Sequence, residues 1–308
     1  MTRYNKELTI ALDLIKEAIK ITEWFRTKKF QSYKKKDDSP VTLADYASQI
    51  YIISKLKDNF PEDQIIAEED VSPLFDKNVE NIIKDCFNST GINTDAKFRD
   101  YLSYRGPNSK RKWTIDPIDG TIGFQKGLSY AIGIGLMVKS DLILSAIGIP
   151  NYNQKGSAIF FAEKNEGAKV VYGNNSPLPI KVSKHQDIKT SLMCHSLHYD
   201  KPWVMKFAKL CGIQRFIQMD SMAKFCMIAE GNADLYIKPM SINQSFSWDF
   251  LPGELLVREA GGIVSDLNGN PLKFENEKCI ISAPGCVASN GLFHKEILNI
   301  IKENRLVE

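Results

Sequence analysis

The stretch WTIDPIDGTIGF at residues 113–124 restricts the fold of this chain more than any other feature of its sequence. Its first residues, WTI at 113–115, are large or β-branched and predict a buried strand. Asp116 and Asp119 follow that strand directly, although two carboxylates held close together repel each other. A fold that places both acids at the end of a buried strand therefore needs something to offset their repulsion.

The residues around these aspartates favour a turn that points both carboxylates at one place. Pro117 restricts its own φ and Gly120 permits a sharp turn, while the carbonyl of Ile118 lies inside the same turn. A hard divalent cation with oxygen ligands, most naturally Mg²⁺, would remove the repulsion between Asp116 and Asp119. The alternative is an ordinary surface turn, because Asp-Pro and Asp-Gly pairs are common in turns.

Two further acidic positions lie at the edges of predicted buried elements. Glu68 follows a short apolar strand at 64–67, and strand ends commonly build active sites in open sheets. Asp249 follows Trp248 at the start of an apolar helix that closes at Gly261, and an N-cap role is the alternative for this aspartate. Acids at the ends of buried elements that are far apart in sequence predict a metal cluster assembled by the fold.

Helical and strand patterns are mixed along the whole chain, and the sequence shows no internal repeat. Apolar residues recur at helical spacing near 8–25, 44–56, 79–87, 203–211, 222–231, 251–260 and 292–304. Strands are predicted near 64–67, 113–115, 130–138, 142–150, 158–162, 169–172, 192–195, 235–237 and 262–265. This order predicts an α/β or α+β layered sandwich of two lobes, residues 1–150 and 151–308, with the active site between them.

The composition is that of an ordinary soluble globular protein, with 43% hydrophobic and 25% charged residues among 308 and a net charge of +3. Because lysines and acids are interspersed, the charge pattern argues against a nucleic-acid-binding surface. No apolar run approaches the ~18 residues that a membrane span needs. The six cysteines are scattered without a C-x-x-C pair, which favours reduced thiols in a cytoplasmic protein over disulfides or a zinc site.

Four stretches together resemble the lithium-sensitive, magnesium-dependent phosphomonoesterase superfamily that includes the inositol monophosphatases. They are SPVTLADYASQ at 39–49, AEED at 67–70, WTIDPIDGTIGF at 113–124 and WDFLPGELLVREAGG at 248–262. Within this superfamily the chain is most similar to the 3′(2′),5′-bisphosphate nucleotidases, through SPVTLADY, the Gly-Phe pair at 123–124 and DSMAKFCMIAEGNADLYIK at 220–238. The resemblance covers nearly the whole chain and implies the layered α/β fold of that superfamily.

The resemblance implies a site for two or three Mg²⁺ ions, with inhibition by Li⁺ at one ion position. It assigns as metal ligands the side chains of Glu68, Asp116, Asp119 and Asp249 and the carbonyl of Ile118. It also assigns Asp45 as the carboxylate that activates the attacking water and Thr121 as the hydroxyl that orients it. A helix-surface acid and a turn-capping hydroxyl are the alternatives for these two residues.

The resemblance further implies a substrate site that lies mainly in the second lobe. Its residues would be Gly120, Thr121, His195, Ser221, Lys224, Lys238 and Asp249. Lys224 would meet a second phosphate as a point charge, and an exposed position on a helix is its alternative. The nucleotidases usually carry arginine where this chain has Lys238, and lysine can neither stack on a base nor donate through a planar fork. We therefore expect weaker recognition of the base, so inositol 1,4-bisphosphate, which has no base, is a further candidate substrate.

The activity implied is removal of the 3′-phosphate of adenosine 3′,5′-bisphosphate (PAP) by a monomeric cytoplasmic enzyme, with the sulfated relative PAPS as a further candidate substrate. An inositol polyphosphate 1-phosphatase or an inositol monophosphatase is the nearest alternative, and the Gly-Phe pair and the D-S-x-x-K stretch disfavour the monophosphatase. A catalytically dead sensor of metal and nucleotide is another alternative, against which the acids at 45, 68, 116, 119 and 249 argue. A nucleic-acid-binding module is the weakest interpretation.

Overall fold

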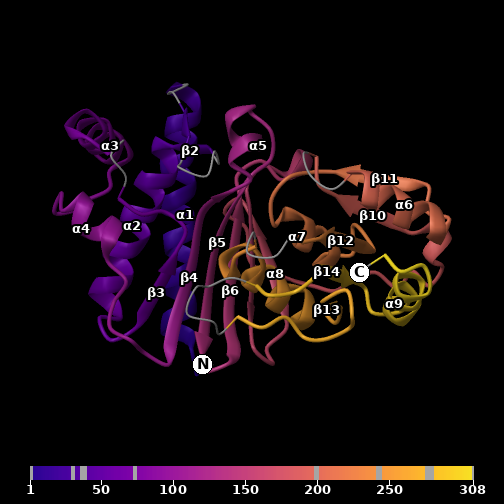
Figure 1. The fold of residues 1–308 in the computed structure, drawn as a ribbon. Helices are drawn as coiled ribbons and strands as arrows, with labels where there is room; N and C mark the ends of the chain where they lie inside the picture. Colours follow the sequence, from indigo (N-terminus) through magenta and orange to yellow (C-terminus); the bar gives the residue numbers. More distant parts are fainter. Residues whose placement is uncertain are drawn as a thin grey trace.

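Helices and sheets alternate in layers across the molecule (Figure 1). The computed structural model describes residues 3–28, 32–34, 40–71, 75–197, 201–240, 245–274 and 281–306. Helices α1 (Asn5–Lys28) and α2 (Leu43–Asn59) cover one face of a seven-stranded sheet. Between this sheet and a five-stranded one lie α7 (Ala223–Ala229) and α8 (Ser247–Glu259), and the outer face of the second sheet carries α6 (Lys201–Cys211) and α9 (His294–Glu303). This order of layers confirms the predicted α/β sandwich.

The larger sheet has the strand order β3-β4-β5-β6-β7-β8-β9. Its strands are β3 (Gln64–Ala67), β4 (Arg111–Asp119), β5 (Ala131–Val138), β6 (Asp141–Ile149), β7 (Ala158–Glu163), β8 (Ala168–Tyr172) and β9 (Leu178–Ile180). β3 runs parallel to β4 and is joined to it through α3 (Lys77–Thr90) and α4 (Phe98–Ser103), whereas the later neighbours are antiparallel. The parallel pair brings the ends of β3 and β4, and the acids that follow them, to the same edge of the sheet.

Alternation along β5 explains how α8 comes close to this sheet. Ile132 and Ile134 belong to the core that α1 and α2 cover, whereas the intervening positions are glycines. A Cβ on Gly135 would lie 2.3 Å from a methyl carbon of Leu251 in α8, far inside van der Waals contact. A Cβ on Gly133 would lie 2.6 Å from the terminal methyl of Met222, which precedes α7. Glycine on this face therefore sets how deeply the inner helices sit against the sheet.

In the smaller sheet, the connections lead to opposite sides of one strand. Its order is β11-β10-β12-β14-β13, with β10 (Leu192–His195), β11 (Arg215–Gln218), β12 (Leu235–Pro239), β13 (Ile263–Ser265) and β14 (Gly285–Ser289). β10 is parallel to both of its neighbours. The chain reaches β11 on one side of β10 through α6 and reaches β12 on the other side through α7. A crevice opens at the carboxyl ends of parallel strands where the connections diverge in this way.

The predicted strands and helices all correspond to elements of the structure, but several short elements are not predicted. β1 (Ser32–Lys34) pairs with β2 (Pro40–Thr42), α5 (Thr121–Gln125) follows β4, and 3₁₀ turns lie at Asn153–Lys155 and Ile188–Thr190. β11 and β14 are also absent from the predicted set. The segment of β11, RFIQ, mixes polar and apolar residues, and that of β14, GCVAS, consists mostly of small ones, so neither carries a strong local strand pattern.

The larger sheet continues beyond the predicted boundary between the lobes. Residue 150 falls between β6 and β7, and the sheet ends at β9. The division into residues 1–150 and 151–308 stays a prediction. Among the described residues, no helix combines the length and the apolar character that crossing a membrane requires.

Candidate active site

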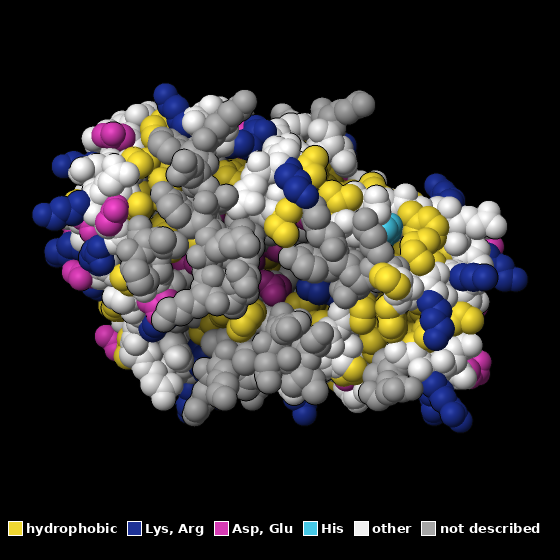
Figure 2. Space-filling model, turned by 45° about the horizontal axis from the view of Figure 1, so that its top comes forward, with side chains coloured by type: hydrophobic (Ala, Val, Ile, Leu, Met, Phe, Trp, Pro, Cys, Tyr) yellow, Lys and Arg dark blue, Asp and Glu magenta, His cyan; other side chains and the backbone are white. Residues whose placement is uncertain are grey.

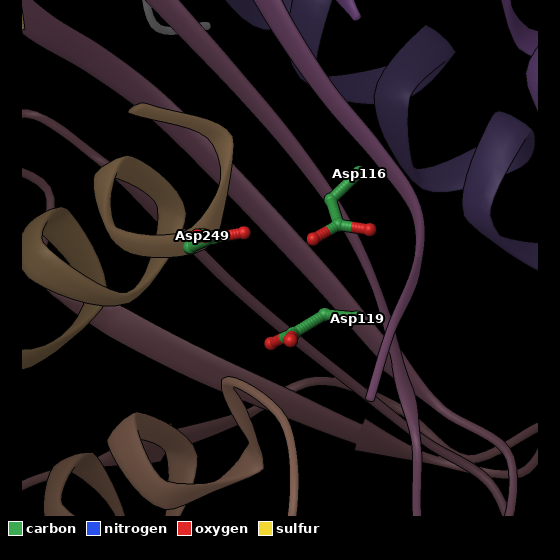
Figure 3. A group of neighbouring side chains, drawn as sticks. All are labelled: Asp116, Asp119 and Asp249. Atoms are coloured by element: carbon green, nitrogen blue, oxygen red, sulfur yellow. The ribbon is translucent and has the colours of Figure 1, made fainter. Parts of the chain in front are cut away.

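Three aspartates from two elements converge in one place (Figure 3). Asp116 and Asp119 come from the end of β4, and Asp249 comes from the first turn of α8. Each offers one carboxylate oxygen, and these oxygens lie within 4.8 Å of one another. Asp116 is buried, and the other two are half-buried. An all-oxygen set of anionic donors at this spacing suits a hard divalent cation such as Mg²⁺.

The path of β4 explains how two aspartates three positions apart come to share one side. The strand continues through Pro117 to Asp119, but its register against β5 shifts between Asp116 and Asp119. In a regular strand, residues three apart face opposite sides, so the irregularity lets both carboxylates face α8. The Ile118 amide donates to Asp116 Oδ1 at 3.1 Å, and Ser48 Oγ of α2 donates to the Pro117 carbonyl at 3.4 Å. The predicted turn is therefore an irregular strand end, which α2 supports.

Glu68 reaches the same place from the end of β3. Its amide donates to the Ile115 carbonyl at 3.3 Å, which extends the pairing of β3 with β4 by one residue. The next residue, Glu69, is joined to the Gln49 side chain of α2 by two hydrogen bonds of 2.7 and 2.9 Å. Repulsion from Glu68 contributes to the raised pKa of Asp116, so the two carboxylates lie close together. The fold thus brings the predicted fourth acidic ligand next to the three aspartates.

Asp249 lies inside the first turn of α8 and not at its N-cap, which is the position of Phe246. Asp249 Oδ2 accepts from the Phe246 amide at 3.4 Å, and the Asp249 amide donates to the Phe246 carbonyl at 3.2 Å. The N-cap alternative for Asp249 is therefore wrong, because the N-cap lies three residues earlier. The Asp249 side chain nevertheless accepts a hydrogen bond from an amide at the start of the helix. A carboxylate in the first turn is also stabilised by the helix dipole.

Burial and mutual repulsion disfavour the charged forms of these carboxylates. Burial, reinforced by Glu68 and the neighbouring aspartates, raises the pKa of Asp116 well above its ordinary value. Burial also raises the pKa of Asp119 to about 6 and, together with repulsion from Asp119, that of Asp249 to about 7. A divalent cation among these oxygens would favour their charged forms instead. The donor set therefore fits a bound Mg²⁺.

The acidic cluster adjoins a cavity of about 210 Å³. Its described lining is Glu68, Asp119, Gly120, Thr121, Ile122, Ser196, Asp220, Ser221, Met222, Lys224, Phe225, Tyr236, Lys238, Asp249 and Phe250. Figure 2 shows a hollow near the middle of the surface, with an acidic and a basic side chain at its bottom. We call Glu68, Asp119 and Asp249, with Asp116 beside them, the acidic side of the cavity, and Lys224 and Lys238 its basic side. Most residues predicted for the site therefore meet in one place.

The basic side consists of two lysines that lie against aromatic rings. Lys224, in α7, is only 5% exposed, so the alternative of an exposed helix lysine is wrong. Its Nζ donates to the Ser221 carbonyl at 2.6 Å and lies 5.3 Å from the ring centre of Tyr236. Burial lowers the pKa of Lys224 to about 8, against the opposing effect of Asp119. Lys238, at the end of β12, lies 5.2 Å from the ring centre of a neighbouring phenylalanine.

Two parts of the site are not among the predicted residues. The Met222 amide donates to Asp119 Oδ2. This hydrogen bond links the segment between β11 and α7 to the acidic side. Asp220 lines the cavity next to Ser221. The Asp220 carboxylate could have been included from its place at the start of DSMAKF, because it precedes two predicted residues. A backbone amide offers no such signal, since each residue except proline carries one.

His195 is not among the described residues that line this cavity. It ends β10 and borders a second hollow of about 450 Å³, whose described lining also includes Met205, Phe216 and Gln218. The His195 and Phe216 rings meet edge to face, with centres 5.8 Å apart. The next residue, Ser196, lines the first cavity, so the carboxyl end of β10 borders both hollows.

The two predicted catalytic residues have different surroundings. Thr121 lines the cavity as the first residue of α5, and its Oγ1 donates to the Ile118 carbonyl at 3.2 Å. Asp45 is fully buried in the first turn of α2, where its Oδ2 accepts from the Thr42 amide at 2.8 Å and the Thr42 hydroxyl at 2.6 Å. The helix-surface alternative for Asp45 is therefore wrong, although Asp45 is not among the described residues that line the cavity.

Known proteins align with this chain over nearly its whole length. A model of the inositol monophosphatase family matches residues 4–305. The chain is 32% identical over 334 residues to a 3′(2′),5′-bisphosphate nucleotidase of Schizosaccharomyces pombe, which covers 96% of this chain and 94% of the relative. It is 30% identical over 344 residues to 3′(2′),5′-bisphosphate nucleotidase 2 of Candida albicans, which covers 96% of each.

Solved structures share the fold over the same length. An IMPase of Thermotoga maritima superposes with a TM-score of 0.72 at 21% identity, covering 98% of this chain and 100% of that one. The extragenic suppressor protein of Bartonella henselae gives a TM-score of 0.72 at 17% identity, covering 97% of this chain and 99% of that one. At these identities the likeness concerns the fold, and it agrees with the layered sandwich described above.

Proposed function

Because the chain belongs to the inositol monophosphatase family, we propose that it is a Mg²⁺-dependent bisphosphate nucleotidase. The reaction would remove the 3′-phosphate of PAP and release AMP and phosphate. The observation that carries this proposal is one cavity whose described lining contains both clustered carboxylates and two lysines. Metal ions on the acidic side suit the phosphate that is cleaved, and lysines suit a second phosphate that is retained.

The acidic side supplies the proposed metal ligands. They are the side chains of Glu68, Asp116, Asp119 and Asp249 and the carbonyl of Ile118, for two or three Mg²⁺ ions. Bound Mg²⁺ would neutralise the phosphoryl oxygens and the leaving alkoxide, which a phosphate monoester needs because its uncatalysed hydrolysis is very slow. The raised pKa values of Asp119 and Asp249 support this role, since a nearby cation would stabilise the charged forms of both carboxylates. We expect Li⁺ to inhibit by competing for one ion position.

We assign the attacking water to Thr121 and Asp45. The Thr121 hydroxyl donates its only proton to the Ile118 carbonyl, so its oxygen can only accept from a water in the cavity. A water that donates to Thr121 is oriented with a lone pair free for attack on phosphorus. Asp45 would accept the proton that this water loses, and Thr42 fixes one of its carboxylate oxygens in place.

The retained parts of the substrate are assigned to the second lobe and the loop after β4. Lys224 and Lys238 would hold the second phosphate, with contacts from Gly120, Thr121, Ser221 and Asp249. The hollow at His195 offers an aromatic and apolar surface of the kind on which a nucleobase stacks. Lysine at position 238 contributes no planar fork to base recognition, so we also propose PAPS and inositol 1,4-bisphosphate as substrates. The proposed state is a cytoplasmic monomer.

The experiment is phosphate release with Mg²⁺ from PAP, inositol 1,4-bisphosphate and inositol 1-phosphate in parallel. We expect the highest kcat/KM for PAP and the lowest for inositol 1-phosphate, which offers no second phosphate to Lys224. EDTA should abolish each activity, and excess Mg²⁺ should restore it. A preference for inositol 1-phosphate would contradict the substrate assignment alone. Metal-independent turnover, or no turnover with any of the three, would contradict the metal site as well.

A further inference from the structure

Two residues with left-handed backbone face each other in the lining of the cavity. Gly120, which follows Asp119, has a φ of 88°, and Ser221, which precedes Met222, has a φ of 70°. A Cβ on Gly120 would lie 3.2 Å from the Ser221 Cβ, so the two backbones approach closely. Left-handed backbone suits glycine but is unfavourable for serine, whose Cβ crowds the carbonyl oxygen. Such a conformation persists where the surrounding contacts require it, most often at functional sites.

The peptide unit that follows Ser221 contacts both sides of the cavity. Its N–H, which belongs to Met222, donates to Asp119 Oδ2. Its C=O, which belongs to Ser221, accepts from Lys224 Nζ at 2.6 Å. The N–H and C=O of a trans peptide point in opposite directions in one plane, so a single orientation of this unit satisfies both partners. If the unit turned over, its carbonyl oxygen would face the Asp119 carboxylate and its N–H would face the Lys224 ammonium.

We propose that the Ser221–Met222 peptide couples the acidic side of the cavity to its basic side, and that Ser221 is a positioning residue acting through its backbone conformation. The inference rests on the proposed function in one respect, namely that Asp119 is a ligand of Mg²⁺. The positive φ of Ser221 orients the peptide unit, which in turn places the Asp119 carboxylate and the Lys224 ammonium relative to each other. The Ser221 hydroxyl has a separate local role, because it accepts from the Ala223 amide at 3.2 Å.

Two substitutions separate the backbone of Ser221 from its hydroxyl. Ser221→Gly removes the hydroxyl and makes the left-handed conformation easy, whereas Ser221→Thr keeps the hydroxyl and makes that conformation harder. The readouts are the Kd of Mg²⁺ by titration calorimetry without substrate and the Kd of inorganic phosphate without Mg²⁺. We expect Ser221→Thr to weaken both by roughly tenfold, and Ser221→Gly to stay within about threefold of the wild type. Loss of the hydroxyl in Ser221→Gly should instead raise KM for PAP.

Asn165 provides the matched control. It has a φ of 69° in the exposed turn between β7 and β8, away from the cavity lining. Asn165→Thr carries a similar backbone cost and should lower Tm, but it should leave the Kd values of Mg²⁺ and phosphate unchanged. Asn165→Gly should change neither Kd.

Three outcomes would overturn the inference alone. Weak Mg²⁺ binding in Ser221→Gly together with normal binding in Ser221→Thr would assign the effect to the hydroxyl. Normal binding in both variants would mean that the peptide positions neither partner. An equal loss in Asn165→Thr would mean that general destabilisation explains the result. A wild-type protein that binds no Mg²⁺ would overturn the proposed function together with this inference, whereas the first three outcomes leave the proposed function intact.

Discussion

The acidic and basic sides of the cavity both bury charge, but their strands belong to different sheets. The acidic side comes from the ends of β3 and β4 and the first turn of α8, which pack on or belong to the larger sheet. The basic side comes from the short helix α7 and from β12 of the smaller sheet. Burial raises the pKa values of Asp119 and Asp249 and lowers that of Lys224. On each side, burial therefore disfavours the charged form of these side chains. The difference supports the proposal that the acidic side binds a cation and the basic side binds a phosphate.

The largest effect is expected from breaking the acidic side with Asp116→Asn, which removes one charge without changing the size of the side chain. Hydrolysis of PAP should fall on the order of 10³-fold, because a central metal ligand is lost. The fold should remain, as judged by circular dichroism and Tm. Asp141→Asn is the control, since Asp141 is an exposed carboxylate at the start of β6 and should be replaceable without loss of activity. Turnover at the wild-type rate in Asp116→Asn would contradict the assignment of Asp116 as a metal ligand.

The metal-free protein should become less stable as pH rises, and Asp249 should account for part of this change. Its pKa in the folded state, about 7, lies above the ordinary 3.8, so the folded state retains a proton that the unfolded state loses. Stability should therefore fall between pH values of about 4 and about 7, by on the order of 2 kcal/mol because water partly screens the site. Urea unfolding in EDTA at both ends of this range measures the effect.

Two controls test this pH dependence. Mg²⁺ should remove it from the wild-type protein, because the bound cation keeps the carboxylates charged. Asp249→Asn should reduce it without added metal, while abolishing Mg²⁺ binding. Because the lowered pKa of buried His294 contributes a slope of opposite sign, the test is the difference between variants: an equal pH dependence in Asp249→Asn and the wild type would contradict the assigned pKa shift.

On the basic side, Lys224→Met should weaken substrate binding without weakening Mg²⁺ binding. We expect KM for PAP to rise roughly 10- to 100-fold, because a charged contact to a phosphate is lost. KM for inositol 1-phosphate should change little. The Kd of Mg²⁺ should stay the same or fall, since a cation near Asp119 has been removed. Lys206→Met on the exposed face of α6 is the matched control. Weaker Mg²⁺ binding in Lys224→Met would mean that this lysine supports the acidic side.

The smallest effect is expected from Lys238→Arg, which refines the basic side without removing its charge. Arginine can stack on a base and donate through a planar fork, so KM for PAP should fall about three- to tenfold. KM for inositol 1,4-bisphosphate should change less, because this substrate has no base. Steady-state kinetics with both substrates measure the ratio. An equal change for both would show that position 238 contacts phosphate and not the base.

The periodic elements of the fold could be predicted from local patterns. β3 and β10 are predicted at their observed bounds, and the helix predicted near 44–56 corresponds to α2, which Thr42 caps by accepting from the Ala44 amide at 3.2 Å. Strand and helix patterns depend on neighbouring side chains, which a sequence displays directly. β11 and β14 could not be predicted this way, because their pairing with other strands, and not their own pattern, makes them strands.

The sequence by itself determined which acids lie at the ends of buried elements, and it thereby indicated the candidate members of a metal site. Only the tertiary structure decided how they meet: the register shift in β4 that lets Asp116 and Asp119 face α8, and the peptide unit that links Asp119 to Lys224. It also decided that Lys224 is buried and that His195 borders a hollow of its own. The physical reason is that these features depend on backbone direction and on contacts between segments far apart in the chain. Local residue patterns encode neither of them.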